Sequence, residues 1–112
     1  MFHKVIPLKP MSVNIAWCGR RFKSKAYKQY EKDFFKVIGR VPKIGGDIEV
    51  TIEWYIKNDK MTDIDNPTKP LLDLLSKAGL WEDDRKIRAL HLYKYGVVNK
   101  NDERIVVVVE EI

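Results

Sequence analysis

The chain has 112 residues, of which 45% are hydrophobic and 33% are charged. This length suits one domain with one core, and no apolar run approaches the roughly 18 to 20 residues that a membrane span needs. We therefore expect a single domain over residues 1–112 that does not enter a membrane. The N-terminal sequence lacks the apolar core of a signal peptide, and Cys18 has no cysteine partner, so we expect a reducing, cytoplasmic location.

The net charge of +5 is distributed unevenly along the chain. Residues 1–46 hold 11 Lys and Arg against 2 acids, a balance of +9, whereas residues 47–112 hold 10 against 14, a balance of −4. The basic half predicts a surface that binds phosphate, and the alternative is a solvated face that only keeps the chain soluble. The acids of the other half need a separate explanation.

The first predicted elements are a strand and a long loop. The strand covers residues 2–10 (FHKVIPLKP) and ends at its prolines, which cannot continue a central ladder. The loop over residues 11–24 is expected to be irregular, and loops of this length in small domains are often functional. It carries three basic and two aromatic side chains, namely Arg20, Arg21, Lys23, Trp17 and Phe22.

A helix is predicted over residues 25–39, with Ser24 as its N-cap and Gly39 at its C-terminal end. Four apolar side chains at helical spacing would form its core face: Ala26, Tyr30, Phe34 and Val37. Four lysines form a second stripe at spacings of three and four: Lys25, Lys28, Lys32 and Lys36. This stripe would follow a phosphate backbone or would form only the wet face of an amphipathic helix.

The rest of the chain predicts one strand, one helix and two further strands. Residues 47–58 alternate with period two, and the apolar face of this strand is Ile48, Val50, Ile52, Trp54 and Ile56. A helix follows from about Asn66 to Lys77. Its first residue is not fixed by the sequence, because Pro70 lacks a backbone N–H near the start of the helical hydrogen bonds. The last strands, RKIRALHLYKYGVV and RIVVVVEEI, are predicted to pair as a β-hairpin. The order β-α-β-α-β-β indicates an α+β fold with helices packed on one mixed sheet.

Four aspartates flank the second predicted helix. Asp63 and Asp65 precede it, and two residues of separation would put both carboxylates on one side of an extended backbone. Asp83 and Asp84 follow it, and they reach the first pair only if residues 78–84 fold back and the next strand starts beside Asp63. Converging carboxylates repel unless a hard cation binds among them, which favours Mg²⁺ or Mn²⁺. The alternative is that Asp65 caps the helix and Asp63 is a loop acid.

Lys69 lies four residues after Asp65, about one helical turn further along. It would either pair with Asp65 or hold a phosphate and offset charge that develops in a transition state. Asp73, one turn beyond Lys69, would border the same face or be a plain solvated acid. A calcium loop is excluded, because Thr68 and Leu74 stand where such a loop needs a glycine and an acid.

The stretch DIDNPTKPLLDLLSKAGLWEDD, residues 63–84, resembles the signature of the RusA family of Holliday-junction resolvases. The shared pattern is D-x-D-N, a lysine four residues after the second aspartate, a helix ending in K-A-G-hydrophobic-W, and a D-D pair. The resemblance implies a homodimeric, Mg²⁺-dependent endonuclease that cuts paired strands at four-way DNA junctions, in a family often encoded by phages or prophages. It places essential acids at Asp63, Asp65 and Asp84, with Asp83 as the neighbouring acid, and the essential lysine at Lys69.

The sequence departs from some members of that family before the first aspartate. Where they carry an arginine-rich run, this chain has NDKMT, with Lys60 alone. We therefore expect Arg20, Arg21 and Lys23 to take more of the DNA contact, together with Lys60 and Lys69. The alternative to a nuclease is a non-catalytic nucleic-acid-binding domain or a phage-derived interaction domain.

Overall fold

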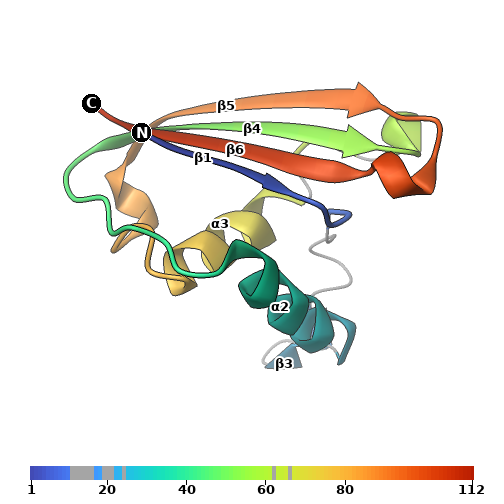
Figure 1. Cartoon of the computed structure of the whole chain (residues 1–112), viewed down its shortest axis with the longest axis horizontal. Helices are drawn as coiled ribbons and strands as arrows, with labels where there is room; N and C mark the ends of the chain where they lie inside the picture. Colours follow the sequence, from blue (N-terminus) through green and yellow to red (C-terminus); the bar gives the residue numbers. More distant parts are fainter. Residues whose placement is uncertain (11–16, 19–21, 24, 62, 66) are drawn as a thin grey trace.

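The computed structural model describes residues 1–10, 17–18, 22–23, 25–61, 63–65 and 67–112 (Figure 1). The strands are β1 (Phe2–Ile6), β2 (Trp17–Cys18), β3 (Phe22–Lys23), β4 (Ile48–Ile56), β5 (Ile87–Gly96) and β6 (Arg104–Glu111). The helices are α2 (Lys25–Ile38) and α3 (Thr68–Lys77), with 3-10 turns η1 (Asp59–Met61), η2 (Asp84–Lys86) and η3 (Lys100–Asp102).

One four-stranded sheet carries both helices on the same face (Figure 1). Its order is β1-β6-β4-β5, in which β6 is antiparallel to β1 and β4, while β4 and β5 are parallel. The predicted α+β fold, with a mixed sheet and the order β-α-β-α-β-β, is confirmed. In the described part of the chain, no helix is long and apolar enough to cross a bilayer.

The core lies between this sheet and the two helices. The predicted alternation of β4 is confirmed, since all five residues of its apolar face are at most 4% exposed. They meet the buried leucines of α3 and the buried aromatic side chains of α2. Burial of each such side chain contributes about 1.5–3 kcal/mol, so this packing fixes where α3 lies against the sheet.

The core face of α2 differs from the predicted one at its first turn. Tyr27 is buried, whereas Ala26 is exposed. The larger side chain removes more apolar area from water, so the helix turns Tyr27 inward. The predicted C-terminal glycine is confirmed, because Gly39 has a φ of +63° and its N–H donates to the carbonyl of Phe35 over 3.1 Å. All four lysines of the predicted stripe are exposed, and Ser24 lies outside the described residues.

The loop predicted over residues 11–24 is not wholly irregular. Strands β2 and β3 form a short antiparallel pair, with Trp17 opposite Lys23 and Cys18 opposite Phe22. Lys23 is therefore on a strand. Arg20 and Arg21 lie outside the described residues.

The predicted hairpin of the last two strands is wrong. β6 lies between β1 and β4, and β5 pairs instead with β4, with Ile87 opposite Ile48 at their starts. The branched side chains of β6 are buried at alternate positions from Ile105 to Val109, whereas no residue of β5 is buried. A strand rich in β-branched residues gains more from a central position, and the more exposed strand takes the edge. Parallel pairing of β4 and β5 then requires a crossover, which α3 supplies.

Helix α3 begins at Thr68, two residues after the predicted start. The N–H of Thr68 donates to the carbonyl of Asp65 over 3.1 Å, and its hydroxyl donates to the carbonyl of Ile64 over 3.0 Å. Pro70 is accommodated because N–H groups in a first helical turn have no acceptor within the helix. The position of Asp65 before the helix follows from this start.

Gly79 ends α3 and reverses the chain. Its φ of +95° is a conformation that residues with a Cβ rarely adopt. Directly after it, the N–H of Leu80 donates to the carbonyl of Leu75 over 3.2 Å, and Leu80 and Trp81 are 0% and 1% exposed. The predicted inward turn of these two side chains is confirmed, and it folds the following residues back toward α3.

We predict that Gly79→Ala lowers the free energy of unfolding by about 1–2 kcal/mol, the strain of a left-handed residue. A Cβ at position 79 would meet no atom within 4 Å, so the loss is conformational rather than steric. Gly45→Ala is the matched control, because a Cβ there also meets nothing within 4 Å and Gly45 has no positive φ. Denaturant unfolding measures both, and equal losses would contradict the role of Gly79.

Candidate functional site

Lys69, in the first turn of α3, joins two carboxylates from different elements. Its Nζ lies 2.8 Å from Oδ1 of Asp73, one turn further along α3, and 3.7 Å from Oδ2 of Asp84 at the start of η2. The hydrogen bond with Asp73 raises the pKa of Lys69, and the negative charge of Asp84 adds to this against partial desolvation. The side chain of Lys69 nevertheless stays 67% exposed.

The partner of Lys69 differs from the predicted alternative. Because α3 begins at Thr68, Asp65 precedes the helix and Asp73 takes the position one helical turn from Lys69. The alternative in which Lys69 pairs with Asp65 is therefore wrong. Asp73 remains 43% exposed while its carboxylate accepts from Lys69, so it borders the same face as Lys69.

Asp84 is held on two sides. Its Oδ1 accepts a hydrogen bond from Nε1 of Trp81 over 2.8 Å, and its Oδ2 faces Lys69. The expected fold-back of residues 78–84 is confirmed by these contacts. The expectation that the next strand starts beside Asp63 is wrong. Strand β5 begins opposite the start of β4, whereas Asp63 follows the end of β4.

Asp83, the neighbouring acid, has a separate set of contacts. It accepts from the backbone N–H of Arg85 over 2.8 Å and lies 3.2 Å from the guanidinium Nη2 of Arg85, so it caps η2. These hydrogen bonds lower the pKa of Asp83. It borders a hollow of about 380 Å³ lined by Asp47, Glu82, Asp83, Arg85 and Lys86. The two adjacent aspartates therefore have different partners: Asp83 contacts Arg85, whereas Asp84 contacts Trp81 and Lys69.

Asp63 and Asp65 lie exposed in the connection between η1 and α3. The N-cap position of α3 is Pro67, which makes no side-chain cap, so Asp65 is not the N-cap residue. Within the described ranges, no group of three or more His, Cys, Asp or Glu side chains is placed to hold a metal ion. The convergence of Asp63 and Asp65 with Asp83 and Asp84 on one metal site stays a prediction. The carboxylate oxygens of these aspartates suit Mg²⁺ or Mn²⁺. In this structure, the ammonium group of Lys69 lies beside Asp84.

The predicted DNA-contacting residues are only partly placed. Lys60 is exposed in η1, and Lys69 is exposed in α3 beside the acids. Lys23 stands on β3, and the other two predicted contacts, Arg20 and Arg21, fall outside the described residues. Sequence reasoning did not assign Trp81 as a partner of Asp84, although the three-residue spacing of the two was visible.

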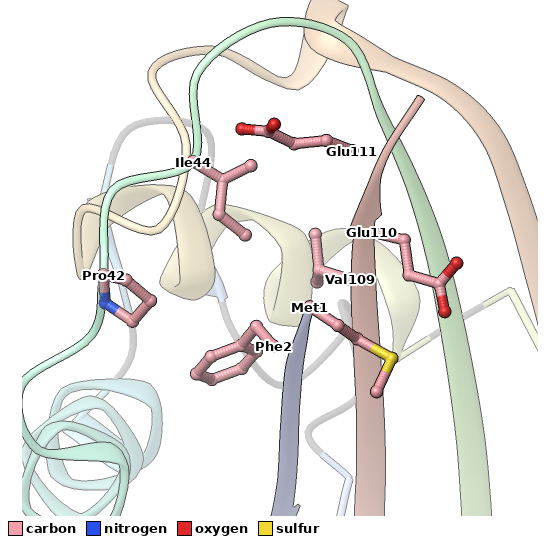
Figure 2. Close-up of a pocket in the computed structure, with 7 residues that line it drawn as sticks. All are labelled: Met1, Phe2, Pro42, Ile44, Val109, Glu110 and Glu111. Atoms are coloured by element: carbon pink, nitrogen blue, oxygen red, sulfur yellow. The ribbon is translucent and has the colours of Figure 1, made fainter.

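The pocket in Figure 2 lies at another place, where β1 begins and β6 ends. Its volume is about 590 Å³, and Phe2, Ile44 and Val109 contribute apolar side chains to it. The rest of the lining is Met1, Pro42, Glu110 and Glu111. No predicted site residue lines this pocket, and its two glutamates would repel phosphate, so it adds nothing to the site around Lys69.

Comparison with known proteins gives one family. The family model described as Endodeoxyribonuclease RusA matches residues 9–110, which include both helices and the whole of residues 63–84. A comparison with curated proteins finds no match.

We predict that Asp73→Asn lowers the pKa of Lys69 toward its ordinary value, because the carboxylate that accepts from the ammonium is lost. NMR titration of labelled lysine side chains at alkaline pH measures this. Asp33→Asn is the matched control, since it removes one negative charge from α2, where Asp33 accepts from Gln29 rather than from Lys69. An equal change in both variants would show that total charge, not the Asp73 contact, sets the pKa.

Proposed function

Since the chain belongs to the RusA endodeoxyribonuclease family, we propose that it cuts four-way DNA junctions by paired, Mg²⁺-dependent phosphodiester hydrolysis. Membership of the family implies endonuclease activity on Holliday junctions. The observation that carries the proposal to particular residues is the meeting of Lys69 and Asp84, which join the two ends of the signature stretch. In this pair, Lys69 would supply an exposed cation for a phosphate that arrives from solvent, and Asp84 would supply a carboxylate for the metal ion.

We propose Asp63, Asp65 and Asp84 as the catalytic acids and, with Asp83, as the residues that hold Mg²⁺, for which Mn²⁺ would substitute. Carboxylate oxygens are the ligands that these hard cations prefer. A bound ion of this kind supplies polarisation of the phosphodiester and activation of water. A bound cation would also offset the repulsion among the neighbouring carboxylates.

Lys69 is proposed to bind the scissile phosphate and to offset the charge that develops there. Its side chain is 67% exposed, so it reaches solvent from the first turn of α3. Asp73, one turn further along α3, accepts a hydrogen bond from Lys69 and raises its pKa. Asp84, 3.7 Å away, is the weaker of its two contacts, so Lys69 can exchange that contact for a phosphate oxygen while it keeps the bond to Asp73.

We infer that the DNA is bound through Arg20, Arg21, Lys23, Lys60 and Lys69, on one nuclease domain over residues 1–112. A junction has approximate two-fold symmetry and needs two nicks, so a homodimer with one site in each subunit would provide both. A cytoplasmic protein of phage or prophage origin would agree with the family resemblance. These proposals rest on the sequence and on the family match.

We predict Mg²⁺-dependent nicking of a labelled four-way junction by the wild type. Asp65→Asn and Lys69→Ala should each lower the rate by about 100- to 1,000-fold, the usual loss when a transition-state contact is removed. Asp33→Asn on α2 and Lys100→Ala on η3 make the same charge changes outside the site and should keep the rate. Binding without cutting by the wild type would favour a non-catalytic nucleic-acid-binding domain, and neither binding nor cutting would favour an interaction domain.

We also predict that junction binding, measured in EDTA by fluorescence anisotropy, weakens steeply as salt rises. Each phosphate contact contributes about 0.9 to the slope of log affinity against log salt. Lys60→Ala should therefore reduce the slope by about that amount. Lys100→Ala, which removes an exposed lysine from η3 outside the predicted contacts, should leave it unchanged. A slope that falls equally in both variants would refute a specific contact by Lys60.

A further inference from the structure

Trp81 and Asp84 form a hydrogen bond where the fold-back segment reaches the surface. Nε1 of Trp81 donates to Oδ1 of Asp84 over 2.8 Å. Trp81 is 1% exposed and belongs to the hydrophobic core, whereas the side chain of Asp84 is 31% exposed. The donor is therefore fixed inside the protein, and the acceptor stands at its surface.

This hydrogen bond selects which oxygen of Asp84 faces the site. An indole N–H is only a donor, so the direction of the bond is unambiguous, and a bond to a carboxylate is stronger than one between neutral groups. With Oδ1 bound to Trp81, Oδ2 is the oxygen directed at Nζ of Lys69. Without the indole, the short side chain of Asp84 would be free to rotate among its staggered conformations.

We infer that Trp81 is a positioning residue of the nuclease site, which holds the Asp84 carboxylate in the orientation that the reaction uses. The inference deepens the proposed function, on which it rests for the role of Asp84. The hydrogen bond between Trp81 and Asp84 is a feature of the structure and does not depend on the proposed function. Trp81 itself is buried and would touch neither the phosphate nor a metal ion.

The chain offers a matched control in Trp54 of β4. Trp54 is also 1% exposed and also part of the core, but its Nε1 has no hydrogen-bond partner among the residues that the structure describes. Trp→Phe at either position removes a buried indole and retains an aromatic ring. Only at position 81 does the change release a carboxylate of the site.

We predict that Trp81→Phe lowers the cleavage rate at saturating junction and Mg²⁺ by about 10- to 100-fold, as is usual when a residue that orients a metal-binding group is lost. Its affinity for the junction should stay at the wild-type value, because the phosphate-binding side chains are retained. Trp54→Phe should keep the wild-type rate. A wild-type rate in Trp81→Phe, or equal losses in the two variants at equal stability, would overturn the inference.

A second measurement needs no catalysis and does not require Trp81 to be changed. In ¹H–¹⁵N spectra, Asp84→Ala should move the indole resonance of Trp81 and leave that of Trp54 in place. Asp83→Ala is the matched control, because Asp83 contacts Arg85 rather than Trp81. An unmoved Trp81 resonance in Asp84→Ala, or an equal movement in Asp83→Ala, would overturn the inference. If the wild type cuts no junction, the proposed function fails, and these spectra alone decide whether Trp81 holds Asp84.

Discussion

The parallel pairing of β4 with β5 is the constraint on which the candidate site depends. Two parallel neighbours cannot be joined by a tight turn, so the chain must return along the sheet before β5 begins. Helix α3 makes this return on the core face (Figure 1). The signature acids precede and follow it in the sequence. The reversal at Gly79 then brings Asp84 back to Lys69, which the length of the helix alone would have kept apart.

Electrostatics explain why the acids and bases of the chain are separated. The first part of the chain supplies the exposed lysines of α2, and the later part supplies the acids around α3. Lys69 lies between two of these acids, bound to Asp73 and 3.7 Å from Asp84. The proposed reaction would use both kinds of surface, because a basic face would attract the DNA backbone while the carboxylates would hold the metal ion.

Local patterns predicted the elements better than their partners. The alternation of β4 and the glycines after both helices were visible in the sequence, because periodicity and capping depend on neighbouring residues. The predicted hairpin of β5 and β6 was wrong, since strand order depends on which strand gains most from a central position in the sheet. In the site, the fold-back after Gly79 was predictable from Leu80 and Trp81. The pairing of Lys69 with Asp73 was not, because it depends on where α3 begins.

The meeting of Lys69 with Asp84 is the central claim, and zero-length cross-linking tests it most directly. A carbodiimide joins a lysine amine to a carboxylate only where the two groups touch in solution, and mass spectrometry identifies the joined residues. The expected products are Lys69 joined to Asp73 and Lys69 joined to Asp84. A product in which Lys69 is joined to Asp73 but never to Asp84, while Asp84 is joined to another lysine, would contradict the fold-back and the site built on it.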